Sequence, residues 1–120
     1  MRRSATVACV PGLALLLVGC GGGSKLPGDP RAGKDAFIAA GCGACHTFTP
    51  AGTSGQVGPN LDRALKGRNA AFVRESILAP DLKVEKGFSP GVMPNNFGRK
   101  LSDHQISDIV KFLLESPRPD

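Results

Sequence analysis

Residues 42–46 of this chain read Cys-Gly-Ala-Cys-His, which places two thiols and one imidazole in a single short segment. A Cys-x-x-Cys pair occurs in dithiol redox sites, zinc sites, structural disulfides and covalent haem-attachment sites. The neighbouring His46 favours haem attachment, because two thiols can add to the haem vinyl groups while the next residue places an imidazole under the iron. We therefore expect the rest of the chain to fold around one covalently bound haem.

The other three kinds of site fit the sequence less well. Zinc needs four ligands, and the folded part of the chain offers only Cys42, Cys45, His46 and the distant His104. A thioredoxin-like dithiol follows a strand, whereas the residues before Cys42 have a helical pattern. A disulfide would leave His46 without a role. The aromatic content is 5%, all of it phenylalanine, so a buried cofactor would also help to fill a thin core.

Residues 1–19 are typical of a secretory signal peptide. Two arginines precede an apolar stretch over 6–18, which is shorter than the roughly 20 residues that a bilayer-spanning helix needs. Residues 17–20 read Leu-Val-Gly-Cys, which resembles the lipobox of bacterial lipoproteins and predicts that Cys20 carries a diacylglycerol. An ordinary cleaved signal with a chance cysteine, or an uncleaved anchor, remains the alternative. Residues 20–28 are rich in glycine and predict a flexible tether.

Three helices and almost no strand are predicted, so the fold class is all-α. The first begins at the N-cap Asp29 with Pro30 in its first turn, and stops at Gly41. The second runs from Asn69 to the residues before Pro80, and the third follows a capping box formed by Ser102 and Gln105. Residues 61–66 predict an additional short helical turn. These elements place one domain at 29–116, followed by a short tail at 117–120.

A long irregular segment rich in glycine, proline and asparagine separates the second and third helices, over residues 79–100. A loop of this length in a small domain usually serves a function. It contains Met93, the only methionine left once the signal is removed, whereas a core methionine would normally lie on a helix or strand face. Met93 is therefore the predicted second iron ligand, opposite His46, because a thioether stabilises the reduced iron. The alternative is His104, which more simply faces solvent in the first turn of a helix.

These features resemble the class I cytochrome c family over nearly all of residues 29–116. In that family the N-terminal and C-terminal helices cross near a glycine and an aromatic residue, and Gly33, Phe37 and Phe112 stand in matching places. Residues 58–61 resemble the family's Gly-Pro-x-Leu segment. The resemblance implies that the Pro59 carbonyl accepts the His46 Nδ1 proton. It also implies that Leu61 packs on the haem face.

The chain departs from this family at the haem propionates, which are often bound by tyrosine or tryptophan. The sequence has neither residue, and the candidates that could replace them are Arg68, Arg99, Lys100, Asn95 and Asn96. The region from Glu75 to Leu114 is similar to the cytochrome domains attached to bacterial terminal oxidases. A terminal oxidase, or another membrane electron-transfer complex, is accordingly the expected redox partner.

The expected function is one-electron transfer in a bacterial respiratory or photosynthetic chain, without enzymatic activity. Two alternatives are a haem enzyme or sensor in which Met93 leaves the iron, and a membrane-tethered dithiol oxidoreductase. The formal charge is +5, but no basic stripe with interleaved aromatics indicates nucleic-acid binding. Residues 61–100 hold eight Lys and Arg against four Asp and Glu, which would suit an acidic redox partner or simply a solvated surface. The expected location is extracytoplasmic, anchored to a membrane through Cys20.

Overall fold

A computed structural model describes residues 26–120 of the chain. The predicted signal peptide at 1–19, the lipid site at Cys20 and most of the predicted tether lie outside the described residues. Among the residues that are described, no helix is long and apolar enough to span a membrane. The elements are mostly helical, which confirms the predicted all-α class.

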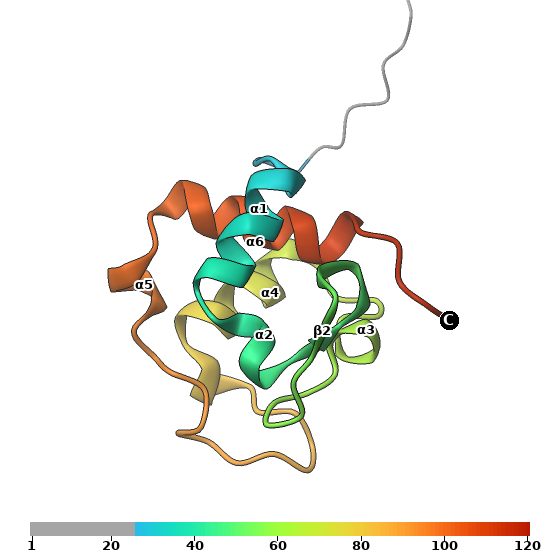
Figure 1. Cartoon of the computed structure of the whole chain (residues 1–120). Coiled ribbons are helices and arrows are strands. Elements are labelled where there is room, and N and C mark those ends of the chain that lie inside the picture. The colour runs from blue at the N-terminus through green and yellow to red at the C-terminus, as the bar shows by residue number, and fades with distance from the viewer. Residues whose placement is uncertain (1–25) are drawn as a thin grey trace, which may run out of the picture.

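The first and last helices cross and form the frame of the domain (Figure 1). Helix α1 spans Pro30–Ala39, and the side chain of its N-cap Asp29 accepts hydrogen bonds from two first-turn amides. Helix α6 spans Asp103–Glu115 and begins with the predicted capping box between Ser102 and Gln105. Both N-terminal predictions are therefore confirmed, because the local cap chemistry already specifies where each helix begins.

At Gly33 the backbone of α1 lies directly against α6. A Cβ atom built on Gly33 would lie only 2.0 Å from the carbonyl oxygen of Asp108 and 2.8 Å from the Cβ of Phe112. The backbones can approach this closely only where α1 lacks a side chain. The crossing at Gly33, Phe37 and Phe112 that the family resemblance implied is present in the structure.

Three phenylalanines fill the space beside this crossing. Phe37 of α1, Phe112 of α6 and Phe48 are all buried, and each ring contacts the other two with centroids 5.3–6.0 Å apart. Their tilted and edge-on arrangements are the ones that aromatic quadrupoles favour. Half of the six phenylalanines of the chain thus belong to one cluster, which lies behind the haem-attachment motif.

A short helix and a hairpin follow α1. Gly41 adopts a left-handed conformation (φ 78°) and starts α2, Cys42–Cys45. Strands β1, Thr47–Phe48, and β2, Thr53–Ser54, pair antiparallel around the 3₁₀ turn η1, Thr49–Ala51. The sequence did not predict this hairpin, since strands of two residues are too short to show an alternating pattern. Side-chain bonds support it, including the bond from the Thr53 hydroxyl to the His46 carbonyl.

The middle of the chain supplies α3, Leu61–Ala64, and α4, Ala70–Leu78. Asn69 caps α4 as predicted, because its side-chain oxygen accepts a hydrogen bond from the Phe72 amide. Asp62 of α3 is buried, and it accepts bonds from both the amide and the hydroxyl of Thr49. This carboxylate fastens α3 to the hairpin.

The irregular loop is shorter than predicted, because regular elements form at both of its ends. Pro80 does end α4, but it also opens the 3₁₀ turn η2, Pro80–Leu82. At the other end, Phe97–Lys100 forms the short helix α5, whose Phe97 is buried. The irregular segment that carries Met93 is therefore confined to residues 83–96.

The residues just before α1 lie against α6. The Lys111 ammonium donates to the Leu26 carbonyl (3.0 Å), and the Asp29 amide donates to the buried carboxylate of Asp108 (2.7 Å). Gly28 has a positive φ of 109° and packs on the α6 backbone. The last part of the predicted tether, residues 26–28, is thus held by the domain.

Replacing Gly33 by alanine should strongly destabilise the protein, because the new methyl group meets a backbone carbonyl that α6 cannot move without losing its own helix. We expect Gly33→Ala to lower the free energy of unfolding by about 3 kcal/mol, measured by urea unfolding of the haem-loaded protein. Gly98→Ala is the matched control: its methyl would meet only the tip of the Leu78 side chain at 3.2 Å, and it should change the free energy by less than about 1 kcal/mol. Equal effects of the two substitutions would contradict the close crossing.

Candidate functional site

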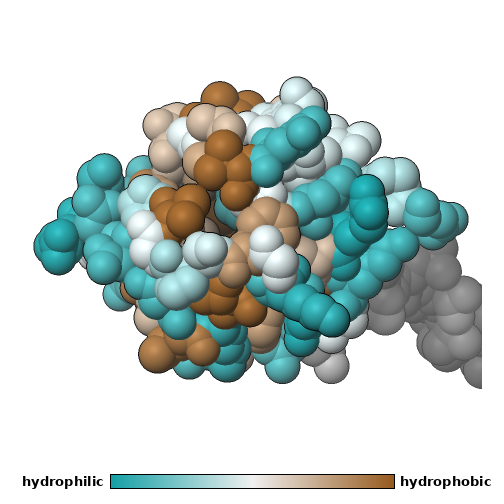
Figure 2. All heavy atoms as spheres, turned by 90° about the horizontal axis from the view of Figure 1, so that it is seen from below, coloured by the Kyte–Doolittle hydropathy of each residue, from teal (hydrophilic) through white to brown (hydrophobic). Residues whose placement is uncertain are grey.

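The haem-attachment motif opens onto a cavity of about 250 Å³. Its walls come from α2, α3, α4, α6 and the Met93 segment. Most of the lining is apolar, with buried or half-buried side chains that include Phe37, Leu61, Leu65, Phe72, Val73, Ile77, Leu101, Ile109 and Leu113. Figure 2 views the molecule from below, where hydrophobic residues run from the top of the view to the bottom and hydrophilic residues lie mainly to either side. A flat apolar group would be well accommodated in this cavity.

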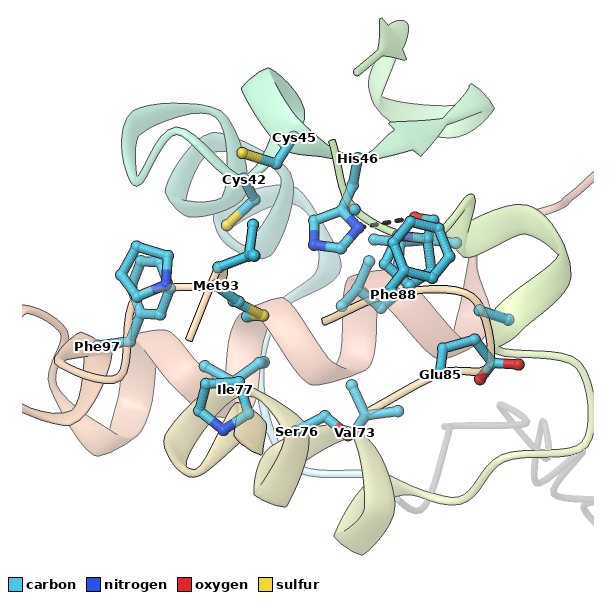
Figure 3. Close-up of a pocket in the computed structure, with 18 of the residues that line it drawn as sticks. Cys42, Cys45, His46, Val73, Ser76, Ile77, Glu85, Phe88, Met93 and Phe97 are labelled. Carbon is cyan, nitrogen blue, oxygen red and sulfur yellow. Dashed lines mark hydrogen bonds between the residues drawn. The ribbon is translucent and has the colours of Figure 1, made fainter. Parts of the chain in front are cut away.

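Cys42 and Cys45 stand at the first and last positions of α2, one turn apart, and both line the cavity (Figure 3). Both thiols are free and half-buried. Burial raises the pKa of the Cys42 thiol, its own backbone amide partly opposes this, and the nearby Cys45 raises it further. An attacking cysteine of a dithiol oxidoreductase has a lowered pKa instead. The direction of this shift at Cys42 does not favour the dithiol alternative.

His46 is buried at the edge of the cavity, and its ring is fixed from two sides. The Nδ1 atom lies 2.7 Å from the Pro59 carbonyl oxygen, which is the hydrogen bond that the family resemblance implied. With Nδ1–H donating to this carbonyl, the Nε2 lone pair is left to bind a metal. On the other side Gly58 lies against the ring, so closely that a Cβ there would be 2.5 Å from His46 Cε1.

The segment from 55 to 60 is itself held against α2. The Gly58 amide donates to the Cys45 carbonyl at 2.7 Å, and a Cβ on Gly55 would lie 2.6 Å from the Ala44 carbonyl oxygen. The Pro59 carbonyl therefore has a fixed position relative to the two thiols. This segment sets the orientation of His46.

Met93 comes from the irregular segment and is half-buried. It lines the same cavity as the two thiols and His46, and Figure 3 shows its thioether inside the cavity. Leu61 also lines the cavity, from the start of α3. The structure thus brings Cys42, Cys45, His46 and Met93 to one place, together with Pro59 and Leu61.

His104 lies elsewhere. Its side chain is 80% exposed and pairs with the carboxylate of Asp108 one turn along α6, at 3.0 Å. It does not line the cavity. This position fits a solvent-facing residue in the first turn of α6 and removes the alternative iron ligand.

The predicted propionate ligands are not in the cavity wall. Arg68 stacks over the ring of Phe72 at 4.4 Å, while Asn95 and Arg99 border a separate groove beside η2. The polar groups that do line the cavity include Ser76 and Lys83, which sequence reasoning missed. No local pattern marks either residue, because each faces the cavity only through the placement of α4 and η2.

These residues fit a covalently bound haem. The cavity offers two free thiols, an imidazole with one nitrogen available and a thioether, surrounded by apolar side chains. Among the described residues, no group of three or more His, Cys, Asp and Glu side chains is placed to hold a metal ion.

The family comparison agrees with this geometry. A family model described as Cytochrome c matches residues 30–117, and the chain belongs to this family. It is a c-type cytochrome that carries haem c through Cys42 and Cys45, and members of the family typically transfer electrons and are typically extracytoplasmic. Comparisons with curated proteins and with solved structures found no match.

The contact between Gly58 and His46 makes a specific prediction. Gly58→Ala should leave both thiols free to bind haem but push the imidazole away from its present position, because the Gly58 backbone is tied to Cys45 and cannot withdraw. We expect covalent haem to persist on a denaturing gel while the absorption and paramagnetic resonance spectra of the oxidised protein change. Gln56→Ala, an exposed change in the same segment, should leave the spectra unchanged. An unaltered spectrum in Gly58→Ala would contradict the proposed role of Gly58 in holding the ring.

Proposed function

We propose that this protein is a one-electron carrier in a bacterial electron-transfer chain, with His46 and Met93 as the two axial ligands of its haem. The observation that carries the proposal is that Met93, far from His46 in sequence, lies in the same apolar cavity as His46 and the two thiols. Haem c supplies an iron that gains and loses a single electron. The chain supplies the two donor atoms, their orientation and an environment that excludes water.

The residues around the cavity favour electron transfer over catalysis on a substrate. With His46 and Met93 both bound, no axial position stays open for another molecule. Apart from Cys42, Cys45 and His46, the titratable groups of the described lining are Asp81, Lys83 and Glu85. All three are exposed residues, so none is a buried acid or base of the kind that acts on a bound substrate. This supports the carrier over the enzyme or sensor alternative.

The test of this ligand pair is Met93→Ala. A thioether ligand stabilises reduced iron, so its loss should lower the reduction potential by at least about 0.1 V, well within the ~0.8 V range that axial ligands span. The weak long-wavelength absorption band that marks sulfur ligation in this family should also disappear. Ile38→Ala, an exposed apolar change on α1 outside the cavity lining, should keep both the band and the potential.

Two results would contradict the proposed carrier. Fast CO binding by the reduced protein with Met93 intact would show that the iron is open, and would favour a sensor or an enzyme. Protein from a haem-ligating host that lacks covalent haem would revive the dithiol oxidoreductase.

The partner we propose is a redox protein with an acidic docking surface, a terminal oxidase in the first instance. The oxidase rests on the similarity of residues 75–114 to oxidase-attached cytochrome domains. The acidic surface rests on the excess of basic residues in 61–100. Lys83 and Lys86 are exposed, and Lys83 lines the cavity together with the exposed apolar side chains of Phe88 and Val92. Such a surface would steer an acidic partner at a rate that falls with ionic strength. The complex that co-migrates with the haem-stained band in native membranes would identify it.

We further propose that Cys20 bears a lipid that keeps the protein at the outer face of a membrane. The support is the lipobox-like sequence at 17–20 and the glycine-rich residues that follow. Cys20→Ser should move the haem-stained protein from the detergent phase to the aqueous phase on detergent partitioning, and mass spectrometry should show a diacylglycerol on the wild-type N-terminus. Cys9→Ser, inside the predicted signal, is the control and should leave the lipid in place. Wild-type protein in the aqueous phase would contradict the anchor.

A further inference from the structure

The segment that carries Met93 is weakly fastened to the rest of the domain. All residues from 81 to 92 are exposed, and between 83 and 96 no regular element forms. Within 84–95, all of which the structure describes, the amide of Phe88 bonds to the nearby Glu85 carbonyl and so stays inside the segment. The amide of Gly91 makes the only hydrogen bond that links these residues to another part of the chain. Its acceptor is the carboxylate of Asp81, at 2.6 Å.

Asp81 is held in place by the turn that contains it and by the helix before that turn. It lies in η2, directly after the buried Pro80, and the Leu82 amide closes the turn by donating to the Ala79 carbonyl at 3.1 Å. Helix α4 precedes this turn and packs against α6. The Asp81 carboxylate is therefore carried by the framework of the domain, while its partner Gly91 belongs to the segment.

Gly91 is placed where the bond matters most. It precedes Met93 by two residues and has a φ of 78°, a left-handed conformation that favours glycine. A hydrogen bond to a carboxylate is stronger than one to a neutral oxygen. Fixing the amide of Gly91 thus limits how far the following residues can swing away from the cavity.

We propose that Asp81 is a positioning residue for the axial ligand: its carboxylate holds Gly91 and thereby keeps Met93 directed at the iron. This inference rests on the proposed ligand role of Met93. Asp81 would act through Gly91 and not as an iron ligand itself. Its effect is on the fraction of time that Met93 is away from the iron, and that fraction sets the apparent affinity of any competing ligand.

The experiment measures imidazole binding to the oxidised, haem-loaded protein. Added imidazole can bind only when Met93 has left, so Asp81→Ala should raise its apparent affinity by roughly tenfold, the effect of losing one bond to a charged group. Asp81→Asn keeps an oxygen acceptor without the charge and should lie between Asp81→Ala and wild type. Asp35→Ala, which removes an exposed carboxylate of α1, is the control and should match wild type.

A second measurement reports on the hydrogen bond itself. Amide hydrogen exchange at Gly91 should become faster in Asp81→Ala, while the amides of α1 and α6 keep their protection. This comparison also separates a local release of the segment from a general loss of stability, which would speed exchange throughout the domain.

The outcomes separate this inference from the proposal on which it rests. If imidazole binds wild type and Met93→Ala equally well, Met93 is not the ligand, and both ideas fail. If Met93→Ala binds imidazole more tightly but Asp81→Ala binds it as wild type does, the role of Asp81 alone is wrong. Equal effects of Asp81→Asn and Asp81→Ala would assign the effect to charge and overturn the positioning bond.

Discussion

The close contact between α1 and α6 at Gly33 is the interaction on which the rest of the site depends. Helix α1 ends at the turn that starts α2, so the position of α1 decides where the two thiols stand. Helix α6 contributes Ile109 and Leu113 to the cavity wall. The distance between thiols and wall is therefore set by how deeply α1 can sit on α6, and that depth is available only because Gly33 has no side chain.

A second layer of constraint fixes the imidazole. His46 leaves α2 in an extended conformation, and the backbone of 55–60 folds back to meet it through the Gly58 and Pro59 contacts. One side of the iron site is thus built from short-range, tightly bonded backbone. On the other side, Met93 lies within residues 84–95, which have one hydrogen bond to another part of the chain, from the Gly91 amide to the Asp81 carboxylate. The two ligands are held with very different stiffness.

The sequence predicted the parts of this arrangement that depend on short-range sequence patterns. The Cys-x-x-Cys-His run identified the attachment site, and cap residues at Asp29, Asn69 and Ser102 located the starts of the three main helices. The contacts between Pro59 and His46 and between Gly33 and α6 were available only through family resemblance, because they join residues whose proximity no local pattern reveals.

What the sequence could not predict depends on longer-range contacts. The hairpin at 47–54 is stabilised by threonine side chains and by a buried carboxylate of α3, and α5 is only four residues long. As charged residues, Asp62 and Asp108 would both be assigned to the solvated surface. Both are buried instead, and each accepts a hydrogen bond from a backbone amide. Only the fold shows which carboxylates are buried and join two segments through hydrogen bonds.

The attachment of residues 26–29 to α6 has a mechanical consequence. Tension on the N-terminal end of the domain would first meet the Lys111 and Asp108 bonds, and would then pass into the crossing of α1 and α6. The loosely held Met93 segment lies at the opposite end of the domain (Figure 1). A pull that arrives through the N-terminus is thus absorbed where the packing is densest, before it can reach the ligand that is easiest to displace.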